Sequence, residues 1–156
     1  NLEVFFLKER FKDVLDIARA ESNVVQDRSI FEGVYIFSAN NRDMGNLDTR
    51  DFETYMELFE LMTSLVDAPD LLIYLRSTVP HLVANIRKRG REYEQSMSIE
   101  YLENLNRRYD EFVFEKYPGP KLVIDVDGLD FLYNPKDFSD IVDRIDAKLF
   151  GLFEKV

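Results

Sequence analysis

The sequence predicts an α/β fold in which a parallel sheet carries helices on both faces. Expected helices alternate with short apolar runs, at Val24–Gln26, Leu71–Leu75 and Leu122–Val126. These runs lack the alternation of a half-exposed strand, which is typical of strands buried on both faces. The 156 residues suit one domain, and 46% of them are hydrophobic, which is enough for a core.

Three helices are expected before the second strand, over residues 2–20, 30–44 and 48–66. Apolar residues recur in them every three or four positions. The last has the clearest periodicity, and Asp48 is its expected N-cap. Its apolar stripe consists of Phe52, Tyr55, Met56, Phe59, Met62 and Val66.

Three further helices are expected after the second strand. One is capped by Thr78 and stops at Gly90, and another covers residues 99–115. Asn134 and Pro135 open the last helix, because Pro suits a first turn. Its apolar stripe consists of Phe138, Ile141, Val142, Ile145, Leu149 and Leu152.

Charged and polar residues follow each expected strand. Right-handed crossovers place the carboxyl ends of parallel strands at one edge, where ligands bind. Asp27 and Arg28 are expected there beside Arg76, Ser77 and 125–127. The alternative for the first pair is a surface ion pair, which contributes little stability. Three strands are few for such a sheet, so one or more strands are expected before the chain begins.

Composition limits the function. The chain has no Cys and one His, which excludes disulfides, argues against structural zinc and favours a reducing compartment, the cytoplasm. No apolar run reaches membrane length. The formal net charge of −10 disfavours nucleic acid. Arg87, Lys88, Arg89 and Arg91 form one basic cluster, which suits either a solvated helix end or a small phosphorylated ligand.

An apolar run ending in Asp27 is typical of the second half of a phosphate site, in which the acid holds Mg²⁺ directly or through water. The first half would be a Gly-x-x-x-x-Gly-Lys loop. That loop is missing from the sequence, because no two of the six glycines have the required spacing.

Three stretches carry a resemblance to a known family. They are QDRSIFEGVYIF, PDLLIYLRSTVPHLVANIRKRGREYEQS with MSIEYLENLNRRYDEF, and LVIDVDGLDF. In order and spacing they resemble the deoxyribonucleoside kinases over essentially the whole chain. The resemblance implies a P-loop kinase fold. Residues 1–156 would then form the C-terminal three-quarters of one family domain, with the P-loop segment upstream.

The resemblance also implies catalytic roles for two groups of residues. Arg28 would bind near the 5′-oxygen and the transferring phosphoryl group, since guanidinium suits anionic oxygens. Asp27 would be an indirect Mg²⁺ partner. Arg89 and Arg91 would close over the phosphates, and Gly90 between them would permit the bend.

Substrate contacts follow from the same resemblance. Glu94 matches the acid that accepts a hydrogen bond from the sugar 3′-hydroxyl, and Phe37 matches a ring that stacks on the base. Glu3 stands where the family usually has a base-reading Gln, and a carboxylate offers only acceptors. Arg10 matches an Arg of purine- and cytosine-using members. Gly33 stands where that Arg usually has an acidic partner. Glu3 is one candidate to take over the role of this missing acid.

The loop after the third strand would border the ATP adenine through Asp130 and Phe131. Asn85 stands where many members place an Arg over that adenine, so donor preference is expected to differ. His81 matches no motif.

The implied activity is ATP-dependent 5′-phosphorylation of a deoxyribonucleoside in nucleotide salvage, with ATP and Mg²⁺. A homodimer through helices 30–44 and 48–66 is expected, with no nucleic-acid or membrane partner. The catalytic base and P-loop Lys fall upstream of Asn1, so the 156 residues alone are expected to be inactive. Two alternatives remain open: a thymidylate-type nucleoside monophosphate kinase, and a non-catalytic interaction module.

Overall fold

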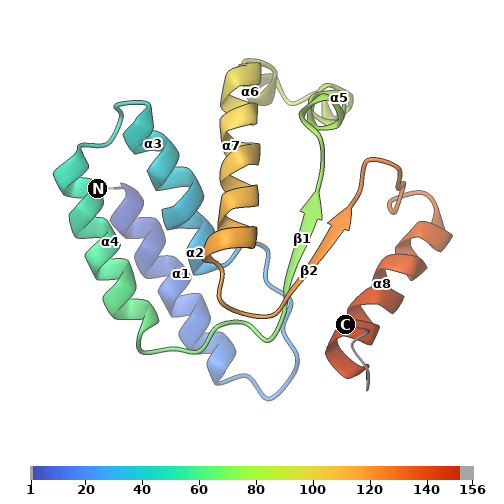
Figure 1. Cartoon of the computed structure of the whole chain (residues 1–156), viewed down its shortest axis with the longest axis horizontal. Coiled ribbons are helices and arrows are strands. Elements are labelled where there is room, and N and C mark those ends of the chain that lie inside the picture. Colours follow the sequence, from blue (N-terminus) through green and yellow to red (C-terminus); the bar gives the residue numbers. More distant parts are fainter. Residues whose placement is uncertain (1, 152–156) are drawn as a thin grey trace. The chain divides into compact units, whose positions relative to one another are not determined.

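The computed structural model describes residues 2–151, except for the side chains of Tyr93 and Gln95 (Figure 1). The chain divides into two compact units. The helical unit comprises Asn1–Ala68 and Asn104–Lys116, and the sheet unit comprises Pro69–Glu103 and Tyr117–Val156.

The described part of the helical unit contains helices and no strand. The expected helices over 2–20, 30–44 and 48–66 are confirmed with shorter or subdivided bounds. The helical elements are α1 (Leu2–Ala18), α2 (Ile30–Glu32), the π-helix η1 (Gly33–Ser38), α3 (Ala39–Asp43), α4 (Thr49–Thr63), the second part of α7 (Ile99–Glu111) and the π-helix η2 (Phe112–Lys116).

Local hydrogen bonds explain where these helices begin. The Asp48 carboxylate accepts from the Arg50 N–H at 2.8 Å, which confirms the predicted N-cap of α4. Ser29 caps α2, because its hydroxyl accepts from the Phe31 N–H at 3.2 Å. Glu32 completes a capping box by accepting from the Ser29 N–H at 2.8 Å.

The core of the helical unit is rich in aromatic residues. Phe59 of α4 is 1% exposed and receives the rings of Phe31 and Tyr35 edge-on. The same two rings stack on Phe112. The buried cluster around Phe59 consists of Leu7, Ile30, Val34, Tyr55 and Phe59.

The predicted strand at Val24–Gln26 is wrong. These residues have no regular structure, and Val25 is 95% exposed. A strand needs a neighbour to satisfy its N–H and C=O groups. Within the described residues, the two paired strands both belong to the sheet unit, so this segment has no partner.

The two remaining predicted strands are confirmed. β1 (Leu72–Arg76) pairs in parallel with β2 (Lys121–Asp125), with Leu72 opposite Lys121 and Arg76 opposite Asp125. Their shared direction places both carboxyl ends at the same edge. The sheet therefore has the predicted parallel orientation, with two described strands instead of three.

Four helices accompany this sheet: α5 (Val79–Arg89), α6 (Glu92–Gln95), the first part of α7 and α8 (Pro135–Phe150). Asn134 caps α8 as predicted, by accepting from the Lys136 N–H at 3.1 Å. Ile141 of α8 packs with Ile124 and Val126 in the core of the unit. No helix within residues 2–151 combines the length and apolar character needed to cross a bilayer.

Candidate functional site

Arg28 has an unusual backbone conformation in the helical unit. Its φ of 61° lies in the left-handed region, which costs a side-chain-bearing residue about 1–3 kcal/mol. The capping box that starts at Ser29 fixes the chain directly after it. The resulting direction brings the Arg28 guanidinium to 4.9 Å from the centroid of the Phe37 ring. Arg28 and Asp27 are both exposed, so an anion could reach them.

Phe37 lies within η1, the π-helical segment. Such segments are rare and frequently occur at functional sites. Its ring faces the Arg28 guanidinium, and the Tyr109 ring meets it edge-on at 6.5 Å between centroids. Arg28 therefore already covers part of the aromatic surface that the resemblance assigns to a nucleobase.

Glu3 and Arg10 have separate partners in the helical unit. The Glu3 carboxylate accepts from the Ser38 hydroxyl at 2.7 Å and from the Asn41 amide at 3.0 Å. Arg10 pairs with Asp13 at 3.6 Å. Glu3 is thus anchored to η1 and α3 instead of replacing the missing acidic partner of Arg10.

Gly33 lies beside Tyr55. A Cβ at Gly33 would stand 3.6 Å from the Tyr55 hydroxyl, which is ordinary van der Waals contact. Burial raises the pKa of Tyr55, against the lowering effect of its hydrogen bond to Ser38, and the charge of Glu3 raises it further. Its hydroxyl therefore stays protonated and available as a donor in this buried polar group.

Arg89 and Arg91 flank Gly90 in the sheet unit. Gly90 ends α5 with a φ of 70°, which favours glycine. Both guanidinium groups donate to the same Glu94 oxygen, Oε1, from Arg89 at 3.2 Å and from Arg91 at 3.1 Å. The Glu94 side chain is only 9% exposed, and its Oε2 has no hydrogen-bond partner among the described residues. The structure thus brings these three predicted residues together.

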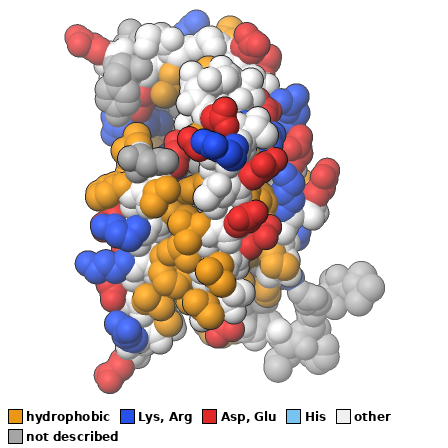
Figure 2. All heavy atoms as spheres, turned by 90° about the vertical axis from the view of Figure 1, so that its left-hand side faces the viewer, with side chains coloured by type: hydrophobic (Ala, Val, Ile, Leu, Met, Phe, Trp, Pro, Cys, Tyr) orange, Lys and Arg blue, Asp and Glu red, His pale blue; other side chains and the backbone are white. Residues whose placement is uncertain are grey.

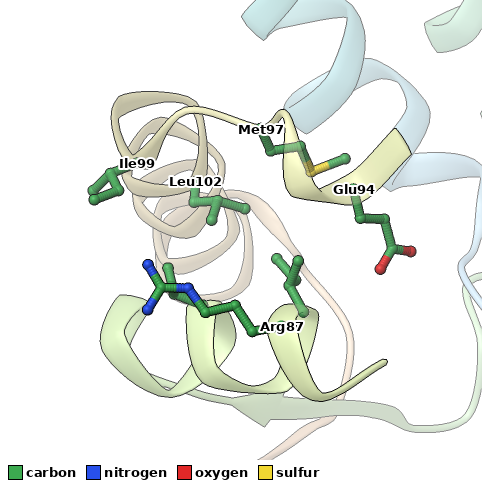
Figure 3. Close-up of a pocket in the computed structure, with 7 residues that line it drawn as sticks. Arg87, Glu94, Met97, Ile99 and Leu102 are labelled. Carbon is green, nitrogen blue, oxygen red and sulfur yellow. The ribbon is translucent and has the colours of Figure 1, made fainter. Parts of the chain in front are cut away.

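A cavity of about 350 Å³ lies next to this group in the sheet unit. Figure 3 shows Glu94 at one end of it and the Arg87 guanidinium near Ile99 at the other. Apart from Glu94 and Arg87, the side chains that line it are apolar. It is lined by Val83, Ile86, Arg87, Glu94, Met97, Ile99 and Leu102.

Asp127 forms a polar cluster with Ser77 and Thr78 at the strand ends, where the sequence places it without a specific role. It follows β2 and accepts from the Ser77 hydroxyl at 2.7 Å and from the Thr78 N–H at 3.0 Å. Hydrogen bonds from Thr78 and Ser77 lower the pKa of Asp127 to about 2. Thr78 holds the predicted N-cap position of α5, but its side chain makes no capping bond to the helix. The predicted gathering of residues 76–77 with 125–127 at the strand ends is confirmed. Asp27 and Arg28, predicted at the same edge, follow a segment that is not a strand.

Asp130 and Phe131 occupy the turn after β2. The Asp130 N–H donates to the Asp137 carboxylate at 2.7 Å. Phe131 is half-buried against the core of the sheet unit. Nearby in the sequence, the exposed Tyr133 ring receives the Lys88 ammonium at 5.2 Å from its centroid. The turn therefore presents one acidic residue and one exposed aromatic ring.

Few carboxylates in the described part of the chain are placed to bind a metal ion. Within the described residues, no group of three or more His, Asp or Glu side chains could hold a metal ion. Mg²⁺ in phosphoryl-transfer sites commonly takes one or two carboxylates, with phosphate and water completing its shell. The exposed Asp27 carboxylate fits such a limited contribution.

Comparison with known proteins identifies clear relatives. The family model described as "Deoxynucleoside kinase" matches residues 1–150. The deoxyadenosine/deoxycytidine kinase of Bacillus subtilis is 36% identical over 147 residues, which cover 93% of this chain and 68% of that protein. The deoxyguanosine kinase of Lactobacillus johnsonii is 36% identical over 164 residues, which cover 98% of this chain and 72% of that protein.

A solved structure shows the same relationship. The deoxyadenosine kinase from M. mycoides with bound dATP superposes with a TM-score of 0.74 at 29% sequence identity. The match covers 92% of this chain and 72% of that one.

Proposed function

Because the chain belongs to the deoxynucleoside kinase family, we propose that its protein transfers the γ-phosphoryl group of ATP to the 5′-hydroxyl of a deoxyribonucleoside. The observation that carries the proposal is the pairing of Arg89 and Arg91 on Glu94. Two guanidinium groups oppose one carboxylate there, so the group keeps a net positive charge. Both arginines are about half exposed, so phosphate oxygens can reach them.

In the proposed reaction, Arg28 supplies further positive charge near the transferring phosphoryl group. Phosphoryl transfer depends on positioning and on stabilising charge at the phosphoryl oxygens. The left-handed backbone at Arg28 and the ring of Phe37 limit where its guanidinium can lie. Asp27 would hold Mg²⁺ through water, and the bound ion would supply positive charge to the phosphates.

A purine deoxynucleoside is the substrate we propose. By resemblance, Arg10 matches an Arg of purine- and cytosine-using members. The Glu3 carboxylate is held by Ser38 and Asn41, and its remaining acceptor capacity would suit base N–H groups. The two relatives named above are a deoxyadenosine/deoxycytidine kinase and a deoxyguanosine kinase, so a purine deoxynucleoside stands in the name of each.

A homodimer completes the proposal. Figure 2 shows hydrophobic side chains gathered on the face of the molecule that includes α4. Along α4 and the turn after it, Leu58, Leu61 and Leu65 are 37%, 64% and 72% exposed. A second copy of the chain would bury this apolar surface. Sedimentation should show a dimer, and Leu61→Lys should convert it to a monomer.

The test of the function uses the natural full-length protein with ATP and Mg²⁺. Each of the four deoxynucleosides and dTMP is offered separately, and monophosphate or diphosphate formation is measured. We expect turnover of at least one purine deoxynucleoside. Turnover of dTMP alone would favour a thymidylate-type kinase. A folded protein without any turnover would favour an interaction module.

A further inference from the structure

We infer that Glu94 is a positioning residue that holds Arg89 and Arg91 together, in addition to any contact it makes with a nucleoside. The inference rests on the proposed kinase function and concerns the same site. It predicts that the rate of phosphoryl transfer depends on Glu94 even when the substrate has no hydroxyl for Glu94 to bind.

Both arginines bind the same carboxylate oxygen of Glu94. Arg89 and Arg91 donate at 3.2 and 3.1 Å to Oε1 of Glu94, and not to its two oxygens separately. Two exposed arginines on either side of a glycine would normally point in many directions. The left-handed turn at Gly90 and the three-residue spacing from Arg91 to Glu94 let one carboxylate hold both.

The second support is the difference in burial. The Glu94 side chain is 9% exposed, whereas the side chains of Arg89 and Arg91 are 51% and 53% exposed. The acid therefore acts as a fixed anchor from which the guanidinium groups extend toward solvent. Charge-assisted hydrogen bonds of this kind are stronger than neutral ones and restrict geometry.

The second carboxylate oxygen of Glu94 remains available to a ligand. Oε2 of Glu94 is buried and has no hydrogen-bond partner among the residues that the structure describes. Buried acceptors are normally paired, so this atom marks a place for a donor from a ligand. In the proposed reaction that donor is the sugar hydroxyl. One oxygen would then serve the arginines and the other the substrate, which couples sugar binding to arginine position.

The enzymatic test compares Glu94→Gln with the unaltered protein on a deoxynucleoside and on its 2′,3′-dideoxy analogue. A positioning role predicts that kcat falls about 10- to 100-fold on both substrates, because misplaced charged groups lower the rate at saturation. A role confined to the hydroxyl predicts a raised KM with unchanged kcat on the deoxynucleoside, and no effect on the analogue. That second pattern would overturn the inference.

Glu92→Gln is the matched control. Glu92 is an exposed acid on the same short helix, α6, and has no assigned role in the site. We expect this variant to keep the kcat and KM of the unaltered protein. An equal loss of kcat in both variants would show a general charge effect and would also overturn the inference.

A spectroscopic measurement separates failure of the inference from failure of the proposed function. Side-chain guanidinium signals of the ligand-free protein, assigned with Arg89→Lys and Arg91→Lys, should show slowed rotation for both arginines. Glu94→Gln should release both. Freely rotating groups in the unaltered protein would overturn the inference, whatever its activity. Slowed rotation without turnover of any nucleoside would reject the kinase function and retain the pairing.

Discussion

The helical unit holds Arg28 by backbone conformation and a ring, whereas the sheet unit holds Arg89 and Arg91 by an ion pair. In the first case a φ of 61° and the face of Phe37 define the direction of the side chain. In the second, one carboxylate oxygen receives both guanidinium groups. The two arrangements place the same functional group by different forces.

The packing of each unit agrees with this difference. The helical unit has a large aromatic core, in which Phe31 and Tyr35 stand between Phe59 and Phe112. Such a core can support a strained backbone residue. The sheet unit has a smaller buried cluster of Ile124, Val126 and Ile141.

Arg28→Ala should have the largest effect on activity. Removing an arginine that stabilises the transferring phosphoryl group should lower kcat about 1,000-fold, as for other arginines in such reactions. Nucleoside affinity should change little, which equilibrium binding of the nucleoside can check. An unchanged kcat would show that Arg28 is structural.

A second variant at the same position tests the backbone strain. Glycine adopts a φ of 61° freely, whereas alanine does not. Arg28→Gly should therefore be more stable than Arg28→Ala by about 1 kcal/mol in thermal or urea unfolding, with equally low activity. Equal stability of the two variants would mean that the residue relaxes to another conformation.

Gly90→Ala and Gly45→Ala form a matched pair across the two units. Both glycines have left-handed φ values, 70° and 74°, and an added Cβ would meet no atom within 4 Å at either. Each substitution should destabilise the protein by about 1 kcal/mol, because alanine disfavours that conformation. Only Gly90→Ala should also lower kcat, since it disturbs the turn between Arg89 and Arg91. Equal kcat values for the two variants would show that the turn at Gly90 does not affect phosphoryl transfer.

Much of the secondary structure could be predicted from the sequence, because it depends on neighbouring residues. The stripe of α4, its cap at Asp48 and the cap of α8 at Asn134 are all local signals. The three-residue spacing of Arg91 and Glu94 is also typical of an ion pair on a helix. Nothing in the sequence indicates that Arg89 binds the same oxygen.

The remaining features depend on contacts that no local pattern records. An apolar segment becomes a strand only beside another strand, so Val24–Gln26 was predicted wrongly. The π-helical turn at Phe37 and the left-handed backbone at Arg28 have no reliable signature in the residues around them. Asp127 reaches Ser77 across 50 positions of the chain, which only the pairing of β1 with β2 explains.

Asp127→Asn should reveal how polar contacts stabilise the sheet unit. The pKa of Asp127 is lowered from 3.8 to about 2 by hydrogen bonds from Thr78 and Ser77. A lowered pKa means that the ionised form stabilises the folded state above the ordinary pKa, and that this contribution is lost as the pH falls through the lowered one. The difference in unfolding free energy between unaltered protein and variant should thus shrink as the pH falls from about 4 to 2. Urea unfolding over this range measures it, and a difference independent of pH would contradict the assignment.

Phe37→Leu should have the smallest effect if the ring mainly orients Arg28. A cation–π contact at a partly exposed site contributes about 0.5–1 kcal/mol, which corresponds to a two- to fivefold lower kcat. The nucleoside KM should then change by no more than that factor. Phe138→Leu, at a 56% exposed ring of α8 in the sheet unit, is the control that should leave both constants unchanged. If Phe37→Leu instead raises KM strongly and leaves kcat intact, the ring belongs to the nucleobase, and Arg28 must be oriented by its backbone alone.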